Sequence, residues 1–355
     1  NGRVKALSKA CLDRTYSLRE KNMKKCIFFV FLYLSIVTNL FSSIFSVELS
    51  PSAGVMFGRA SEYVYLDYKN YQGIPNYNEQ LSQLDYDYTV PYISLNVDSK
   101  LFSFVHLGAN FSIGIPIRCG IMQDYDWMNV YYPANKWKNE LTNYSKHENY
   151  LDHYIDVNFE LGPIIDFSGT VTLVPFVGLG YESIKFTANN GFFRYGKTTK
   201  DGMTPIDEDC EEFSLTGKDI EYRQYSANKD GGDAPHFNLG LNYKINAIPR
   251  FCIKGSFVFF PFYSICSFDF HVRTNTQYIS VIEKSFKFLT NLDISFLIND
   301  MFSVGVFGEF SVVPQLRGIT YSKSTWSNSY SLLYDCQSGI DRISGKVSLS
   351  AHVKL

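Results

Sequence analysis

Cysteine is sparse in this sequence and shows no pairing pattern. Seven Cys are scattered over 355 residues, and none belongs to a C-x-x-C pair. Five lie beyond residue 46, an odd number that does not suit a disulfide framework. They are Cys119, Cys210, Cys252, Cys266 and Cys336. The six His show no ligand spacing with these Cys, so we expect no metal site and no bound cofactor.

Charge is also scarce, whereas aromatic residues are abundant. Lys and Arg number 33 against 35 Asp and Glu, which gives a formal net charge of −2. A chain so close to neutral has no general basis for binding nucleic acid. Aromatic side chains make up 17% of the residues, and many half-buried strands would absorb this surplus.

Long apolar runs are missing except for one near the N-terminus. Residues 1–25 hold eight basic and two acidic residues, and an uncharged apolar stretch follows from Cys26 to Ser46. This pattern is typical of a secretory signal peptide, with a cleavage point near Ser46. Because Met23 begins a compact basic start, we interpret 23–46 as the signal peptide and 1–22 as an upstream non-native segment. The alternative is an uncleaved membrane helix, since 21 uncharged residues can cross a bilayer.

Beyond residue 50 the apolar residues alternate with polar ones. Near the C-terminus, Ile343, Val347 and Leu349 alternate with Lys346 and Ser348. The same period of two recurs over 107–117 and 155–167 and predicts strands with one apolar and one polar face. A soluble sandwich and an outer-membrane barrel both show this alternation, because they differ only in which face meets water.

Turn lengths favour the barrel. Short turns at 98–100, 166–169, 246–249 and 299–300 alternate with long polar segments at 67–80, 125–150, 190–235, 272–282 and 322–337. Short turns on one side and long loops on the other are typical of outer-membrane barrels. The strands expected between them cover about 51–66, 81–97, 101–124, 151–166, 170–188, 236–247, 250–271, 283–298, 301–321 and 338–355. We therefore predict an all-β fold over 47–355, a ten-stranded antiparallel transmembrane β-barrel with long extracellular loops.

Two pairs of ionisable residues stand at the ends of expected strands. Asp124 and Asp126 end the third strand, and Asp269 and His271 end the seventh. Residues two apart share a face of a strand, and strands three and seven lie nearly opposite one another in a ring of ten. The inward register of strand seven stays open, with Pro261 as a possible bulge.

An Asp-His dyad facing two carboxylates can activate water. Asp269 can hold one ring nitrogen of His271 while the other nitrogen takes a proton from water. Two close carboxyls on the opposite side repel one another, so one can stay protonated and donate to a developing oxyanion. The alternative is that all four are solvated rim residues without a chemical role.

The residues around these pairs resemble those of the omptin family of outer-membrane aspartyl-type endopeptidases. The segment 124–128, Asp-Tyr-Asp-Trp-Met, is similar to the family's D-x-D-W-M, and 269–271 is similar to its D-x-H. Further similar segments follow in the family's order at 62–66, 82–85, 145–147, 156–158, 186–188 and in the last strand after 339–340. The resemblance covers most of 50–355 and implies a ten-stranded barrel.

The resemblance also implies an activity and a specificity. It implies peptide-bond hydrolysis at the extracellular rim, with His271, Asp269, Asp124 and Asp126 as catalytic residues and cleavage near basic residues. Glu62 matches the acidic floor of the pocket for the basic side chain. The pocket's second acid is replaced by Ser267, which predicts a weaker basic preference. The acid that receives the residue after the bond falls near Asn139 or Glu140.

The resemblance further assigns Asp85, in the segment 82–85, to substrate binding, and it implies a possible need for lipopolysaccharide on the barrel wall. The matching wall region is 181–185, with shifted spacing. The expected partners are therefore peptides with basic residues and outer-membrane lipid, and we expect a monomer. The expected location is the bacterial outer membrane, with the site facing outward.

Two further interpretations stay open. A non-catalytic barrel on the same scaffold could act as an adhesin or host-protein-binding surface protein. A diffusion porin is disfavoured, because inward charges could pair across a narrow bore and close it. Without residues 1–46 the chain carries 25 basic and 33 acidic residues, and an acidic barrel suits a protease for basic peptides.

Overall fold

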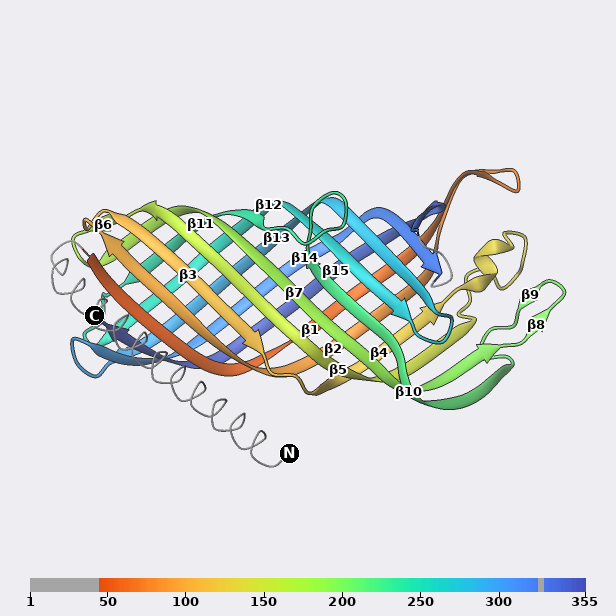
Figure 1. Ribbon diagram of the computed structural model, residues 1–355, viewed down its shortest axis with the longest axis horizontal. Helices are drawn as coiled ribbons and strands as arrows, with labels where there is room; N and C mark the ends of the chain where they lie inside the picture. The colour runs from red at the N-terminus through yellow and green to blue at the C-terminus, as the bar shows by residue number, and fades with distance from the viewer. Residues whose placement is uncertain (1–44, 325–328) are drawn as a thin grey trace, which may run out of the picture.

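The computed structural model describes residues 45–324 and 329–355. Nearly all of them lie in strands that wind obliquely around one elongated barrel (Figure 1). The predicted segments 1–22 and 23–46 lie outside the described residues except for Phe45 and Ser46, which begin the first strand. No helix among the described residues is long and apolar enough to cross a membrane.

The strands are long and follow one another through the whole chain. They are β1 (Phe45–Tyr71), β2 (Ile74–Leu101), β3 (Val105–Gly114), β4 (Arg118–Asp126), β5 (Asn143–Pro163), β6 (Ile165–Phe167), β7 (Val171–Gly196), β8 (Thr198–Thr199), β9 (Gly202–Met203), β10 (Cys210–Ser226), β11 (His236–Ile245), β12 (Phe251–His271), β13 (Thr276–Leu297), β14 (Phe302–Ser324) and β15 (Ser331–Lys354). A short 3-10 helix, η1 (Met128–Tyr131), follows β4.

The sheet closes on itself. β15 pairs antiparallel with β1, from Glu48↔Lys354 upward, and every neighbouring pair around the ring is also antiparallel. β3 and β4 follow each other along β2 and β5, and β11 and β10 do the same along β7 and β12. Each of these two pairs fills one position, so the described residues form a ring of ten positions. The predicted ten-stranded antiparallel barrel is confirmed.

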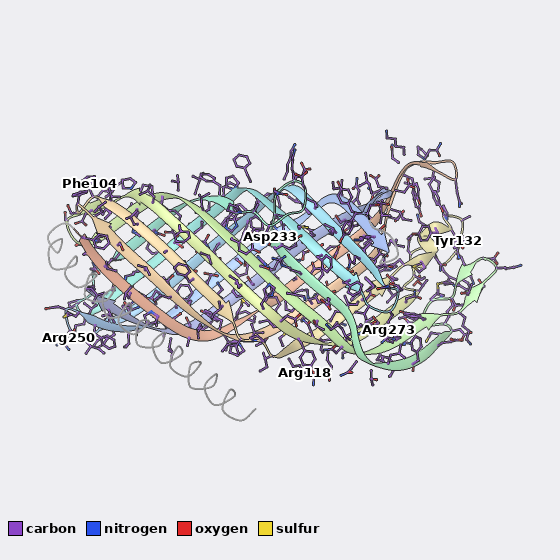
Figure 2. The ribbon with its side chains drawn as sticks, in the orientation of Figure 1. Phe104, Arg118, Tyr132, Asp233, Arg250 and Arg273 are labelled. Carbon is purple, nitrogen blue, oxygen red and sulfur yellow. The ribbon has the colours of Figure 1, made fainter. Side chains whose placement is uncertain are left out.

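The barrel is apolar outside and polar inside. Large apolar side chains point outward from the half that carries the short turns, among them Phe57, Phe159, Phe257 and Leu349, which is 72% exposed. Phe104 and Arg250 mark that end in Figure 2, and Tyr132 and Arg273 lie toward the opposite end, where the long extensions stand. An outward apolar band is what lipid requires, so the alternation in the sequence reflects a bilayer and not a soluble core.

Charged side chains fill the bore below the long-loop end. Glu182 of β7 accepts hydrogen bonds from Lys287 (2.7 Å) and Arg342. Lys346 lies 2.8 Å from Glu309 and 3.4 Å from Asp156. We call these six residues the lumen cluster. The expected pairing of inward charges across the bore is thus present, and removing one partner of such a buried pair leaves the other charge unpaired at high cost.

Four of the five segments predicted as long loops hold more strand than loop: 67–80, 190–235, 272–282, where β13 begins at Thr276, and 322–337, where β15 begins at Ser331. β1 and β2 run through 67–80 and turn at Gln72 and Gly73, whose φ angles are 48° and 82°. The segment 190–235 holds the end of β7, the β8–β9 hairpin and β10. These extensions carry polar residues on both faces because they stand above the lipid-facing band, so no alternation marks them in the sequence.

The register of β12 changes where Pro261 stands. Below it, Phe260 pairs with Lys287 of β13, and above it Tyr263 pairs with Ser285 after a shift. The inward residues are even-numbered before the shift and odd-numbered after it, so Ser256, Asp269 and His271 all face the bore. The predicted bulge at Pro261 is confirmed, and it decides which way the Asp-His dyad points.

Candidate active site

The two predicted pairs meet the lumen at the long-loop end of the barrel. Asp124 and Asp126 end β4, opposite Ser145 and Asn143 of β5. Asp269 and His271 end β12, just before the labelled Arg273 in Figure 2. We call Asp124, Asp126, Asp269, His271 and the nearby Glu62 the site cluster. It lies above the outward apolar band.

Asp269 and His271 form a tight hydrogen-bonded dyad. The His271 Nε2 atom lies 2.6 Å from the Asp269 Oδ2 atom. Burial by itself lowers the pKa of His271, but the Asp269 carboxylate outweighs burial and raises that pKa to about 9. Because Nε2 faces Asp269, Nδ1 is the nitrogen left to exchange a proton with a guest in the lumen.

Asp124 and Asp126 are half-buried, and each lies where a negative charge is unfavourable. Burial first, and then the neighbouring Asp126 charge, raise the pKa of Asp124 well above its ordinary value. Burial also raises the pKa of Asp126, against a hydrogen bond from Ser82. The charge of His271 acts in the opposite direction on both carboxyls, so the two halves of the site lie within one electrostatic field. Crowded carboxyls of raised pKa take up a proton more readily than isolated ones.

Glu62 lies buried on β1 with one carboxylate oxygen satisfied and one free. Its Oε1 atom accepts hydrogen bonds from Ser280 (2.8 Å) and Ser267 (3.0 Å), whereas Oε2 has no partner. Burial and then the Asp269 charge raise the pKa of Glu62 to about 8. Ser267 therefore stands beside Glu62, as the sequence predicted. Ser280 was missed, because the sequence placed 272–282 in a loop.

Aromatic rings pack at the level of the site and below it. The Tyr86 ring stacks on Tyr222 at 4.2 Å and on Phe186 at 5.7 Å, and all three are fully buried. Gln224 lies beside Tyr222 and leaves its Oε1 atom without a partner. Tyr222 and Gln224 lie in the segment 190–235, where the sequence showed no strand. The three stacked rings are part of the buried apolar packing at this level of the barrel.

The predicted role of Asp85 needs correction. Asp85 faces the outer wall, where its Oδ2 atom lies 3.4 Å from the exposed Arg59 and accepts a hydrogen bond from Gln83 at 3.0 Å. Its neighbours Leu84 and Tyr86 take the inward positions of β2. Since residues next to each other on a strand point to opposite faces, Asp85 cannot line the lumen with Glu62.

Glu140 lies exposed in the segment that follows η1. That segment is held in place by Asn129, which is fully buried and exchanges two hydrogen bonds of 2.8 Å with the backbone of Met203. Trp137 donates to Glu208 at 3.0 Å. The segment thus packs against the β8–β9 hairpin, and Glu140 lies on its open side, near the mouth but outside the buried site cluster.

A second cluster, which the alternation did not reveal, borders the site cluster. His147 of β5 lies between Ser145 Oγ (2.8 Å from Nε2) and Asp219 Oδ2 (3.5 Å from Nδ1). Asp219 also lies 2.5 Å from Arg273 Nε. The resemblance at 145–147 had indicated Ser145 and His147 of this group. Asp219 was missed, because it falls within a segment predicted as a loop.

No group of three or more potential ligands among the described residues could hold a metal ion. The five Cys of the described chain are free.

A closed antiparallel barrel with a lipid-facing exterior and a polar bore is the architecture of bacterial outer-membrane proteins. The chain is of that class, with a carboxylate-rich site at one mouth. The model of the Omptin family matches residues 43–354. The chain therefore belongs to the Omptin family, and its location is the bacterial outer membrane.

One solved structure superimposes closely on this fold. The outer membrane protease OmpT from Escherichia coli superimposes with a TM-score of 0.72 at 17% identity, over 87% of this chain and 97% of that one. The toluene transporter TodX of Pseudomonas putida matches with a TM-score of only 0.27 at 9% identity, over 86% and 89% of the two chains. A comparison with curated protein sequences finds no match.

Proposed function

We propose that this protein is an outer-membrane endopeptidase that hydrolyses peptide bonds at the extracellular mouth of its barrel. The observation that carries the proposal is the Asp269–His271 hydrogen bond of 2.6 Å in a lumen that also holds Asp124 and Asp126, two half-buried carboxyls of raised pKa. Family membership and the likeness to a protease barrel support it.

In the proposed mechanism, water is the nucleophile. Neutral His271 keeps its Nε2 proton toward Asp269 and takes a proton from water at Nδ1 while the water oxygen attacks the carbonyl carbon. Protonated Asp124 donates to the developing oxyanion, and Asp126 holds Asp124 in its protonated state through charge repulsion. Collapse of the tetrahedral intermediate breaks the C–N bond, and His271 returns the proton to the leaving amine.

The pocket around Glu62 is proposed to receive the side chain before the scissile bond. The free Oε2 of Glu62 and the free Oε1 of Gln224 are buried acceptors that suit a donor-rich guest such as Lys or Arg. The pocket's second family acid is absent here, because Ser267 is neutral and donates to Glu62. We therefore propose a preference for basic residues that is weaker than two carboxylates would give.

Lipopolysaccharide is retained as a proposed activator. Tyr181, Lys185 and Arg223 lie on the outer wall, but Lys185 is bonded to Glu221 (2.9 Å) and Arg223 to Asp233 (2.5 Å). Glu182, in the same predicted region, faces the lumen instead. Lipid phosphates must compete with these carboxylates, so we expect a modest activation. Equal turnover with and without added lipopolysaccharide in detergent would remove the lipid from the proposal.

The decisive test is cleavage by refolded protein of residues 47–355. Fluorogenic peptides with basic and with neutral residues before the bond are assayed beside the His271→Ala and Asp124→Ala variants. Loss of an acid–base group removes about 10²–10⁴-fold of rate, and each variant is assayed at a temperature where circular dichroism shows that it is folded. Turnover that survives both substitutions rules out the mechanism. A folded parent without turnover on any peptide favours a surface binding protein.

A further inference from the structure

A chain of polar contacts runs along the wall between the two halves of the candidate site. It begins at Ser145, the cross-strand partner of Asp124, and continues through His147 on β5. From there it crosses β7 to Asp219 on β10 and ends at Arg273, two residues after His271. The backbone N–H of Val272 also donates to the carbonyl of Asp219 at 2.8 Å.

Two irregularities in the sheet make this series of polar contacts possible. Asp219 is an extra residue on β10, because Lys218 pairs with Asn189 and Ile220 with the adjacent Ala188. On β7 an extra residue at 190–191 lies opposite His147, and Asn190 has a φ of 55°. Bulges re-aim side chains next to active sites, and here the β10 bulge turns Asp219 inward although Ile220 is also buried.

Gly191 leaves the space through which His147 reaches across β7. A Cβ atom at Gly191 would lie 2.6 Å from the His147 Cε1 atom and 2.6 Å from the Phe193 ring. Phe193 packs edge-on against the His147 ring at 5.3 Å, and Arg273 lies 5.0 Å above the Phe193 ring. The ring of His147 is thus enclosed on β7, with Nε2 hydrogen-bonded to Ser145 and Nδ1 facing the Asp219 carboxylate at 3.5 Å.

We propose that Asp219, held by Arg273, is a positioning residue of the endopeptidase site. It fixes the Ser145–His147 pair beside Asp124, and it also fixes the end of β12 that carries His271. This inference rests on the proposed function. The four residues Ser145, His147, Asp219 and Arg273 are called the brace.

The charges of the brace agree with a positioning role. Burial lowers the pKa of His147 to about 4, against the Asp219 charge and together with those of Arg273 and His271. Neutral His147 can donate from Nδ1 to Asp219 and accept at Nε2 from Ser145. The Asp219 charge is also among the causes that raise the pKa of Asp124. It acts in the same direction on the pKa of Tyr195 of β7.

The connectivity Ser145–His147–Asp219 is that of a hydrolase triad, but its geometry favours positioning. The Ser145 side chain is only 2% exposed, and the distance of 3.5 Å from His147 to Asp219 is long for a hydrogen bond. The catalytic Asp124 lies directly beside it on the neighbouring strand. Ser145 is therefore a support for Asp124, and water stays the nucleophile.

The test compares Asp219→Asn and Arg273→Gln with Asp87→Asn, in which an outer-wall carboxylate bonded to Arg59 loses its charge in the same way. We expect kcat to fall about tenfold to a hundredfold in the two brace variants with KM within about threefold, as misplaced catalytic groups do. In Asp219→Asn the alkaline limb of the pH profile should move to lower pH, because Asp124 loses a neighbouring negative charge. Gly191→Ala keeps that charge and should lower kcat without moving the limb.

The outcomes separate the brace from the proposed function. If the parent is active and its Asp219→Asn and Arg273→Gln variants have the same kcat and the same pH profile as Asp87→Asn, the positioning role of the brace is wrong. The proposed function is unaffected by that result. Covalent labelling of Ser145 by a fluorophosphonate also overturns the positioning role, since a nucleophile would then stand where we place a support. A folded parent without turnover overturns the proposed function, and the brace as a device of catalysis falls with it. Arg273, half-buried at the rim, gives the variant expected to fold in every case.

Discussion

The lumen cluster and the site cluster hold similar residues in opposite electrostatic states. In the lumen cluster, Glu182 is bonded to both Lys287 and Arg342, and Lys346 lies between Asp156 and Glu309. In the site cluster four carboxyls face one imidazole, and Glu62 Oε2 and Asp269 Oδ1 are buried without partners. Both lie inside the same barrel, so burial alone does not distinguish them.

The difference shows which buried charged groups are paired within the protein and which are left unpaired until a substrate binds. Paired buried charges satisfy one another and hold opposite walls together. Unpaired buried acceptors and crowded carboxyls destabilise the free protein, and a donor-rich substrate or a developing oxyanion can relieve them. The following predictions test this division, from the largest expected effect to the smallest.

Removing Glu182 should give the largest loss of stability. Glu182→Ala leaves Lys287 and Arg342 buried without their carboxylate, which costs about 3–5 kcal/mol. The free energy of unfolding in urea and detergent measures it, and turnover per folded molecule should stay within about twofold. Glu182→Met, of similar volume, is the control for packing. An unchanged unfolding midpoint would show that the lumen cluster does not stabilise the barrel.

Activity should rise with pH while the stability contributed by His271 falls. The pKa of His271 is about 9, so kcat should increase about fiftyfold from pH 7 to pH 9 if neutral His271 is the base. Because this pKa lies above the ordinary 6.5, the stabilisation is complete below pH 6.5 and is lost as pH rises through 9.

Peptides with a basic residue before the bond should show a second, steeper dependence in kcat/KM, because Glu62, with a pKa of about 8, must also ionise. Neutral peptides lack this second dependence and serve as the matched substrate. A flat profile between pH 7 and pH 9 contradicts the role of His271 as the base.

The Glu62 pocket should control the preference for basic peptides. Glu62→Gln should reduce the ratio of kcat/KM for basic over neutral peptides by about thirtyfold, equivalent to about 2 kcal/mol, because a buried charge partner is removed. Ser267→Asp should move the ratio the other way by adding a second carboxylate. If both variants keep the parent ratio, the basic side chain binds elsewhere.

The smallest effect is expected on the outer wall. Asp85 is buried, but its charge meets the exposed Arg59, and a pair with a solvent-screened partner contributes about 1 kcal/mol or less, so Asp85→Asn should have little effect on stability. Turnover on basic and neutral peptides should equal that of the parent. A selective loss on basic peptides would restore Asp85 to the substrate site from which its outward orientation removes it.

How far the sequence predicted the site depends on local regularity. Asp124 and Asp126 could be placed on the inward face, because β3 alternates clearly and the break at Arg118–Gly120 leaves the parity of the upper part unchanged. The orientation of Asp269 and His271 could not be derived, since a register shift at Pro261 reverses parity and alternation does not show its size. Asp219 was hidden for the same reason, within an unpredicted strand that itself carries a bulge.

The sequence by itself determined the antiparallel barrel, the strand count and the four ionisable residues at the strand ends, because alternation and turn length depend only on neighbouring residues. Tertiary structure alone decided the rest. It turned Asp85 outward, placed Ser280 against Glu62, and joined Asp219 to His147 across β7. These contacts link strands that are distant in sequence, and their geometry depends on the closure of the ring and on bulges that shift its register by single residues.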